Sequence, residues 1–463
     1  MLNDSMGSVF WKICSMTTGA IERIYLPKKL GASVVGDIDL IGGKALILYV
    51  ISSLGFNFYI PKVLPTEYRD RPREILKKVY SISLFSLVSI SPVVWLFSIY
   101  IVDESVSLPS FLASMALASM YISADLLFYY FTSQEHATKA SFLFFLVRSI
   151  RLLNMIFLFM IWEKSARAYL GAVIFTYFAV VLYFGRKDLR VGIPDFSMMD
   201  KMKYFFFLSI TQNIYPGLGR MLQGKYYDSE SVFLLANAGY IVEFMALFGY
   251  MFAFSASPIF SSHFKNNQIE KSKVHFRELV RLALMATIPF VIFVIFNASE
   301  IMELGANEKI GGAGSMLIVL SLIPILRIFT LIGGALLTMS GYEKVEITNN
   351  IVRLISYLVF ANILGSRYIY GISLALLLSD VALFVMVALE LRSYFSLNIL
   401  SPKELAFLLS ITIVETYLCY LFFRFEGLKL LYMGLIFLSL SLSISLPLSP
   451  FNDFKKLIGR FGS

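Results

Sequence analysis

The sequence predicts an all-α polytopic membrane protein of about 14 transmembrane helices. Of its 463 residues, 58% are hydrophobic and only 15% are charged, and the mean hydropathy is +0.74. Apolar runs of about 20 residues, the length that a helix needs to cross a bilayer, recur along the whole chain. No extended polar region lies between these runs to form a soluble domain. These observations exclude an ordinary soluble globular protein.

The predicted helices follow one another with short connections, so each is assigned by the position of its apolar run. We expect them at residues 6–26, 37–60, 79–101, 109–131, 141–162, 166–185, 203–223, 232–257, 279–297, 312–338, 347–364, 368–390, 404–423 and 430–447.

The connections differ in charge, and this difference predicts the orientation. Roughly 23 Lys and Arg side chains lie in or beside alternate connections, against about 10 on the other side, as the positive-inside rule requires. With the N-terminus inside, these basic connections are cytoplasmic. We therefore expect both termini in the cytoplasm, and we expect the first apolar run to be retained rather than cleaved as a signal peptide.

The predicted helices suggest two related lobes. Long basic connections follow the second helix of each group of six, and residues 191–202 between the groups contain Gly192 and Pro194, a composition typical of a linker. The alternative is that this similarity arose by chance. The predicted organisation lists a six-helix lobe over 1–190, a cytoplasmic linker over 191–202, a second six-helix lobe over 203–392, two more helices within 403–447, and a cytoplasmic tail over 448–463.

Several classes of function are not supported by the sequence. There is no phosphate-binding loop, no nucleophile elbow and no cluster of metal ligands, so we expect neither an enzyme nor a cofactor. The net charge of +9 arises mainly in connections between helices, which membrane topology explains without a nucleic-acid partner. Active transport would then depend on an ion gradient, the membrane potential or substrate supply.

Charged residues interrupt the first two apolar segments. Lys12, Glu22 and Arg23 lie in the first, and Asp39 and Lys44 lie in the second. An ionisable group inside a bilayer costs several kcal/mol unless it is paired or faces water, so these segments predict the wall of a polar cavity. The alternative is that Lys12 and Arg23 extend to opposite membrane surfaces, leaving no polar stripe.

Four further arginines lie in apolar segments. Arg148 and Arg151 are one helical turn apart and form a basic stripe, or else they extend to lipid phosphates. Arg327 lies near the middle of its segment, where a cavity or a buried partner is favoured. Arg220 follows Pro216 in a stretch expected to bend, and it could serve only as an anchor at the outer surface.

Carboxylates also occur in apolar segments. Asp125, Glu243 and Asp380, like Glu22 and Asp39, either pair with intramembrane arginines or bind a coupling proton or cation, and the sequence leaves both open. In the predicted first lobe, positive residues outnumber negative ones among the charged residues of the apolar segments. A cationic cavity suits an anionic ligand, particularly a phosphate or pyrophosphate, which guanidinium groups bind through paired hydrogen bonds.

Three stretches together resemble a known superfamily. LGASVVGDIDL at residues 30–40 resembles the first two helices of MviN-type lipid II flippases and related polysaccharide flippases. The stretch from Thr211 to Ser261 resembles their seventh and eighth helices, and GALLTMSGYEK at residues 334–344 resembles a connection of Wzx-type O-antigen flippases. These families belong to the multidrug/oligosaccharidyl-lipid/polysaccharide (MOP) exporter superfamily.

The resemblance implies two six-helix lobes around a central cavity and transport by alternating access. It implies an undecaprenyl-pyrophosphate-linked oligosaccharide as substrate, and a pyrophosphate held by Arg23 and Lys44 with help from Arg327 or Arg220. It also implies a bacterial cytoplasmic (inner) membrane location, contact with membrane lipids, and possible partnership with a polysaccharide polymerase and a chain-length regulator.

The substrate stays open among related cargoes. Tyr49 lies in the part of the second helix where lipid II flippases carry a basic residue, and this difference favours an O-antigen, capsule or exopolysaccharide repeat unit. A lipid II flippase and a cation-coupled multidrug exporter of the same superfamily are the alternatives. A scaffold that transports nothing is a further alternative.

Overall fold

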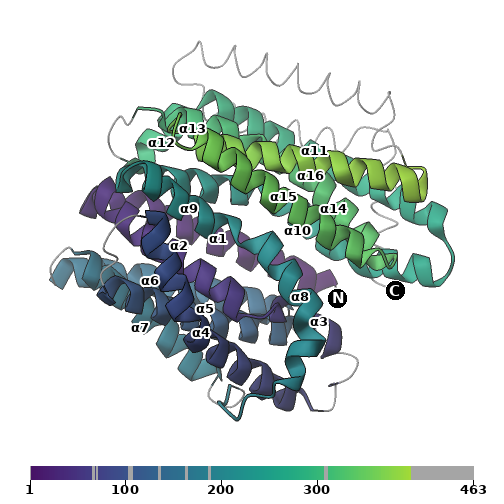
Figure 1. Ribbon diagram of the computed structural model, residues 1–463, viewed down its shortest axis with the longest axis horizontal. Helices are drawn as coiled ribbons and strands as arrows, with labels where there is room; N and C mark the ends of the chain where they lie inside the picture. Colours follow the sequence, from purple (N-terminus) through teal and green to yellow (C-terminus); the bar gives the residue numbers. More distant parts are fainter. Residues whose placement is uncertain are drawn as a thin grey trace. The chain divides into compact units, whose positions relative to one another are not determined.

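The computed structural model describes residues 2–64, 68, 71–102, 108–133, 137–161, 165–185, 189–306 and 311–397. Within these residues the secondary structure is helical, with no strand, so the predicted all-α class is confirmed (Figure 1). The two predicted C-terminal helices and the tail after them lie outside the described residues.

Seven helices lie in the described residues before residue 190. Their bounds are α1 Leu2–Leu30, α2 Ala32–Ser52, α3 Phe56–Val63, α4 Pro72–Val102, α5 Leu108–Ser133, α6 Ala137–Ile161 and α7 Ala166–Gly185.

The helices that follow residue 190 include the longest helix of the described residues, α10. Their bounds are α8 Ser197–Asn213, α9 Tyr215–Tyr226, α10 Ser229–Lys265, α11 Ile269–Phe296, α12 Ala298–Ala306, α13 Ala313–Ser321, α14 Ile323–Met339, α15 Glu343–Leu364 and α16 Gly371–Phe395.

Three segments predicted as single helices are each two helices. Residues 37–60 are interrupted at Leu54 and Gly55, which have φ angles of 51° and 76°. The segments 203–223 and 312–338 are interrupted before α9 and α14, where a proline lies in the first turn of each second helix. Proline lacks the N–H that would continue the preceding helix, so a new helix starts there. The short helix α12 was not predicted.

Seven segments within the described residues are long and apolar enough to cross a membrane. They are Pro72–Ile99, Leu108–Thr132, Thr138–Phe157, Ile269–Phe296, Ala313–Met339, Glu343–Leu364 and Gly371–Phe395. This finding supports a protein that crosses the membrane several times.

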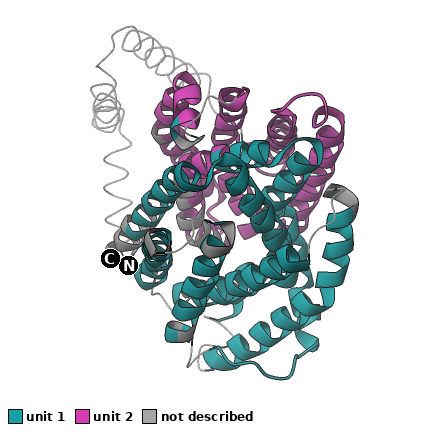
Figure 2. Ribbon diagram, turned by 90° about the vertical axis from the view of Figure 1, so that its left-hand side faces the viewer, with its two compact units in different colours: residues 1–237, 304–309 teal, residues 238–303, 310–463 magenta. Residues whose placement is uncertain are grey.

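The chain divides into two compact units (Figure 2). Unit 1 comprises Met1–Asn237 with Leu304–Lys309, and unit 2 comprises Ala238–Glu303 with Ile310–Ser463. The predicted lobe limits at 1–190 and 203–392 stay a prediction.

In unit 1, α1 packs along α6, and α2 packs against α4, α5 and α9. Glycines allow the close approach of α2 and α9: a Cβ at Gly217 would lie 2.7 Å from Ile47 Cγ1 and 2.8 Å from the Gly43 carbonyl oxygen. Since these positions carry no side chain, polar groups on α2 and α9 lie close to each other.

In unit 2, α14 packs against α11 and α16, and α15 packs along α16. Phe276, Ile332 and Leu336 are fully buried in the apolar cluster that joins α11, α14 and α16. This packing brings charged residues of α14, α15 and α16 into one interior.

Candidate functional site

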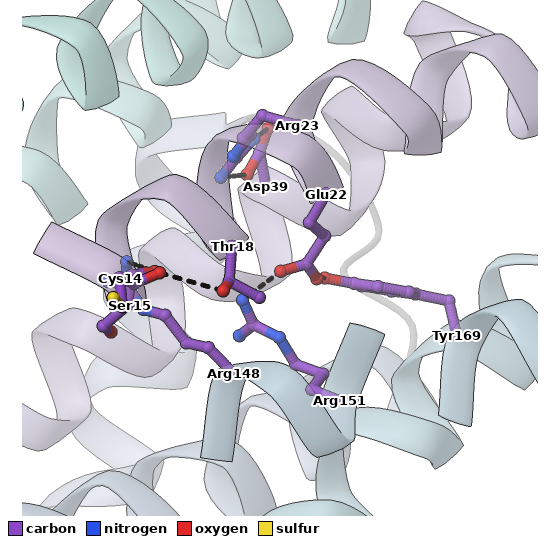
Figure 3. A network of polar contacts seen from close by, with 9 residues as sticks. All are labelled: Cys14, Ser15, Thr18, Glu22, Arg23, Asp39, Arg148, Arg151 and Tyr169. Atoms are coloured by element: carbon purple, nitrogen blue, oxygen red, sulfur yellow. Dashed lines mark hydrogen bonds and ion pairs between the residues drawn. The ribbon is translucent and has the colours of Figure 1, made fainter. Parts of the chain in front are cut away.

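Two neighbouring residues of α1 begin two polar clusters in unit 1 (Figure 3). Glu22 is 3% exposed, accepts a hydrogen bond from Tyr169 Oη at 2.6 Å, and pairs with Arg151 Nη2 of α6. We call Glu22, Arg151 and Tyr169 the Glu22 cluster. It joins α1, α6 and α7 through one buried carboxylate.

Arg23 begins the second cluster and turns to α2. Its Nη1 and Nη2 donate to the two carboxylate oxygens of Asp39, at 2.6 Å and 2.7 Å. Arg220 Nη1 of α9 lies 3.9 Å from Asp39 Oδ1. We call Arg23, Asp39 and Arg220 the Asp39 cluster, in which two guanidinium groups share one carboxylate.

The backbone explains how Arg220 reaches Asp39. A new helix, α9, starts at Tyr215, with Pro216 in its first turn, and Arg220 lies one turn further along. On α2, a Cβ at Gly42 would lie 3.3 Å from Arg220 Nη1, and one at Gly43 would lie 3.1 Å from Arg220 Cβ. The glycine pair therefore leaves the space that the arginine side chain occupies.

In both clusters the carboxylate side chains are less exposed than the arginine side chains. The side chains of Asp39 and Glu22 are 5% and 4% exposed, whereas those of Arg23, Arg220 and Arg151 are 22%, 19% and 17% exposed. The negative charges are thus covered and the positive groups are partly accessible. Each guanidinium carries five N–H donors, and Asp39 takes only two of those of Arg23.

The charge balance of these clusters is positive. Arg23, Arg151 and Arg220 provide three positive charges and Glu22 and Asp39 two negative ones, which leaves an excess of one. Arg148 adds a further positive charge and donates from Nη1 to the Ser15 carbonyl oxygen at 3.1 Å. Arginine stays charged at any physiological pH, so the excess is permanent.

Three tyrosines, Tyr49 of α2, Tyr121 of α5 and Tyr177 of α7, form a row of neighbouring rings. The Tyr121 ring lies 6.2 Å from that of Tyr49 and 5.6 Å from that of Tyr177, both edge to face. Tyr121 also interacts electrostatically with groups of both clusters, among them Arg151 and Arg220. Aromatic rings with hydroxyl groups suit contacts with sugars as well as with apolar ligands.

Three other predicted site residues of unit 1 do not belong to the Glu22 cluster or the Asp39 cluster. Lys44 is on α2 and is only 4% exposed, so direct contact with a ligand would require it to become accessible. Asp125 accepts a hydrogen bond from Tyr49 Oη at 2.5 Å, so a tyrosine rather than an arginine is its partner. Lys12 lies in α1, and its side chain is not among those described.

In unit 2, Asp380 is the centre of another cationic group. Its side chain is 1% exposed, and Arg353 Nη2 lies 2.6 Å from Oδ1 and Arg327 Nε 3.6 Å from Oδ2. Of the cavity or buried partner expected for Arg327, the structure shows a buried partner, Asp380. Glu243 is exposed on α10, and no ion pair of the described residues includes it.

Arg353 and the tyrosines described above were not among the predicted site residues. Arg353 lies within an apolar helix, and the rule that identified Arg327 would have identified it. Tyr49 and Tyr169 gave no signal, because a tyrosine in an apolar segment is common and its hydroxyl partner depends on tertiary packing.

Comparisons with solved structures identify proteins that share the fold of this chain. No family model matches the chain, and no curated protein matches it in sequence. Among solved structures, a lipid II flippase MurJ in an inward closed conformation matches with a TM-score of 0.68 at 15% identity, over 99% of this chain and 100% of that one.

Other solved transporter structures match as well. An inward-facing multidrug resistance MATE family transporter of the MOP superfamily has a TM-score of 0.61 at 13% identity, over 85% of this chain and 98% of that one. A MOP superfamily transporter from Pyrococcus furiosus, described as having a binding pocket of reverse polarity, has a TM-score of 0.54 at 14% identity, over 85% of this chain and 96% of that one. The chain therefore has the fold shared by these transporters.

Proposed function

We propose that this chain, which has the fold of the MOP-superfamily transporters, is a flippase. Its substrate is an undecaprenyl-pyrophosphate-linked oligosaccharide, an O-antigen, capsule or exopolysaccharide repeat unit, that moves from the inner to the outer leaflet of a bacterial cytoplasmic membrane by alternating access. The protein acts as a transporter and not as an enzyme.

The observation that carries this proposal is the Asp39 cluster. Two arginines, from α1 and α9, share one buried carboxylate of α2, and both arginine side chains keep about a fifth of their surface exposed. A permanent positive excess in a low-dielectric environment favours a ligand with negative charge. A pyrophosphate matches the fork geometry of guanidinium groups, which bind its oxygens in pairs.

The remaining parts of the substrate follow from the same arrangement. The sugars would contact the tyrosines Tyr49, Tyr121 and Tyr177, whose rings lie edge to face with one another. The polyprenyl chain is apolar and stays in lipid. Lys44 is a further proposed contact of the pyrophosphate in a conformation that exposes its side chain.

The experiment uses purified protein in proteoliposomes and follows the leaflet accessibility of a fluorescent lipid-linked oligosaccharide. Wild-type protein should move the lipid, and Arg23→Gln and Arg220→Gln should each slow movement by about tenfold or more, because a charge-assisted contact to phosphate contributes about 1.5–3 kcal/mol. Arg190→Gln is the matched control, since Arg190 is exposed in the segment before α8.

The outcomes separate the candidate cargoes. Movement of lipid II but not of other lipid-linked sugars would favour the lipid II alternative, which the MurJ likeness supports. Export of cationic dyes that depends on Glu243 or Asp380 but not on Arg23 would favour a cation-coupled drug exporter, which the MATE likeness supports. Equal movement by wild type and both arginine variants would refute the proposed phosphate contact.

A further inference from the structure

A connection in unit 1 leaves large apolar side chains uncovered. Residues 189–196 lead into α8 without forming a helix, and we call them the connecting segment. Val191, Ile193 and Phe196 of this segment are 68%, 93% and 55% exposed. Three such side chains within six residues form an apolar patch, which indicates contact with another molecule or with lipid.

The connecting segment lies along α4. The Gly192 N–H donates to the Ser81 hydroxyl oxygen at 2.7 Å. The ring of Phe196 lies 5.4 Å from that of Phe85, edge to face. Both contacts are with α4, so the surroundings of this helix determine what covers the segment.

This part of α4 is where charged sequence gives way to apolar sequence. From Val79 to Val102 the helix has no charged residue, and Pro72–Ile99 is long and apolar enough to cross a membrane. Phe85 and Val88 are 47% and 65% exposed, so this side of α4 faces lipid. The connecting segment therefore lies where lipid headgroups meet acyl chains.

The charged side chains around the connecting segment are mainly positive. Residues 71–78 and 189–203 carry seven basic and three acidic side chains, which leaves an excess of four positive charges. A membrane surface with negative lipids attracts such clusters, and each basic side chain near it strengthens binding by about fivefold. Charge and apolar surface thus favour the same partner, a lipid with a negative headgroup.

Two of the basic side chains, Lys77 and Arg190, are available to such a headgroup. Both are exposed, and neither forms an ion pair within the described residues. Lys78 is different, because its Nζ lies 3.2 Å from Glu74 Oε1 and 3.3 Å from Asp195 Oδ2. The acidic side chains closest to the segment therefore neutralise Lys78.

Gly192 allows the Lys77 side chain to lie across the connecting segment. A Cβ at Gly192 would lie 2.4 Å from Lys77 Cε and 3.3 Å from its Nζ. The ammonium group is therefore next to the backbone between Val191 and Ile193. A positive charge beside uncovered apolar side chains matches a phospholipid at the membrane surface, which offers a phosphate and acyl chains together.

We propose that the connecting segment binds an anionic phospholipid, with Lys77 and Arg190 at the headgroup phosphate and the apolar patch of Val191, Ile193 and Phe196 among the acyl chains. The lipid belongs to the leaflet on the side of this connection, which the sequence predicts to be cytoplasmic. This inference goes beyond the proposed flippase activity and does not depend on it.

The test is native mass spectrometry of the purified full-length protein in detergent, titrated with phosphatidylglycerol or phosphatidylcholine. Wild type should bind phosphatidylglycerol about tenfold or more tightly than phosphatidylcholine. Lys77→Gln with Arg190→Gln should weaken phosphatidylglycerol binding by about tenfold or more, because each charge contributes about fivefold. Lys265→Gln with Arg392→Gln removes two exposed charges of unit 2 and should bind as wild type does.

A further variant tests the apolar half of the site. Ile193 is 93% exposed, so Ile193→Ser leaves the packing of the protein unchanged and should weaken binding of both lipids severalfold. Equal affinity of wild type for the two lipids, or an equal loss in the control variant, overturns the proposal. Displacement of phosphatidylglycerol by soluble glycerol phosphate at equal concentration also overturns it, because the ligand would then be a free phosphate.

Discussion

In each ion pair with a buried carboxylate, the carboxylate side chain is less exposed than the arginine side chain that it contacts. Glu22, Asp39 and Asp380 have side chains that are at most 5% exposed, and each contacts at least one guanidinium group. Burying a charge in an apolar interior is costly unless a partner and hydrogen bonds compensate. These carboxylates therefore position arginines, and the accessible chemistry is cationic.

Removing the charge of Asp380 should strongly destabilise unit 2. Asp380→Asn leaves the Arg353 side chain, which is 7% exposed, without its counter-charge. Loss of one partner of a buried pair costs about 3–5 kcal/mol. Thermal unfolding of the purified variant should show a Tm lower by several degrees than that of wild type.

The control for Asp380 removes both charges of the close pair. In Asp380→Leu with Arg353→Met, two buried charges are replaced by apolar side chains of similar size, which is often neutral for stability. The double variant should be more stable than Asp380→Asn. If the single variant has the Tm of wild type, the pair is not a buried structural contact.

At the residue scale, the sequence predicted the charges but not their partners. Glu22, Arg23, Asp39 and Arg327 were predictable as site residues from their places in apolar segments, because lipid excludes unpaired charge. The pairing of Asp39 with both Arg23 and Arg220 depends on how α1, α2 and α9 pack, and no local pattern contains that information.

At the element scale, close contacts between helices depend on single glycines. A Cβ at Gly36 of α2 would lie 1.6 Å from the Ser229 carbonyl oxygen, so Gly36→Ala requires a backbone shift near the start of α10. We expect it to destabilise the protein by about 1–3 kcal/mol, the usual cost of overpacking. Thermal unfolding measures the effect.

Gly171 provides the matched control for Gly36. It lies exposed in α7, and a Cβ there would meet no atom within 4 Å. Gly171→Ala should leave the Tm unchanged or raise it slightly, because alanine favours a helix by about 1 kcal/mol over glycine. Equal effects of the two substitutions would mean that α2 does not approach Ser229 closely.

The start of α8 is joined to α4 by Asp195. Its Oδ1 accepts hydrogen bonds from the Ser197 hydroxyl at 2.6 Å and backbone N–H at 3.2 Å, and Lys78 Nζ lies 3.3 Å from Oδ2. The Ser197 hydroxyl, with Lys78 next, lowers the pKa of Asp195 below its ordinary value of 3.8.

This lowered pKa gives a pH dependence with a defined sign. A carboxylate whose pKa is lower in the folded state stabilises the fold above its ordinary pKa, and that stability is lost as the pH falls below it. Asp195→Asn should thus lower the Tm at pH 7, with the difference from wild type shrinking below about pH 4. Asp200→Asn, exposed on α8, is the control, and a difference that persists unchanged at pH 3 would contradict the assignment.

Helices were predictable from apolar runs, whereas their interruptions were only partly so. The bend expected around Pro216 is a break between α8 and α9, in keeping with the proline signal. The break between α2 and α3 depends on Leu54 adopting a left-handed conformation with Gly55, and leucine gives no sequence signal for this. The short helix α12 is too brief to show a clear periodicity.

For the whole molecule, the fold was predictable although the sequence identity to similar solved structures is low. The MurJ structure, at 15% identity, matches nearly the whole chain, and the apolar length of the helices and the charge of the connections are enough to predict this fold class. The proposed cargo cannot be read from the fold, because under this proposal it depends on a few charged and aromatic residues, those of the Asp39 cluster among them.

The proposed function requires that the positive excess of the Asp39 cluster, rather than the ion pair itself, binds the substrate. Arg23→Gln alone lowers the charge of this cluster from plus one to zero, since Arg220 and Asp39 then cancel. Arg23→Gln with Asp39→Asn removes one charge of each sign and leaves the excess at plus one, on Arg220. The two variants thus separate charge from pairing.

The most direct measurement compares these variants in proteoliposomes containing a fluorescent lipid-linked oligosaccharide, at equal amounts of folded protein. Arg23→Gln should move the lipid about tenfold more slowly than wild type, because a charge-assisted contact to phosphate contributes about 1.5–3 kcal/mol. Adding Asp39→Asn should restore a substantial part of the rate, because the positive excess of the cluster returns. Rates equally low in both variants, or equal to wild type in both, would contradict binding of a pyrophosphate by this cluster.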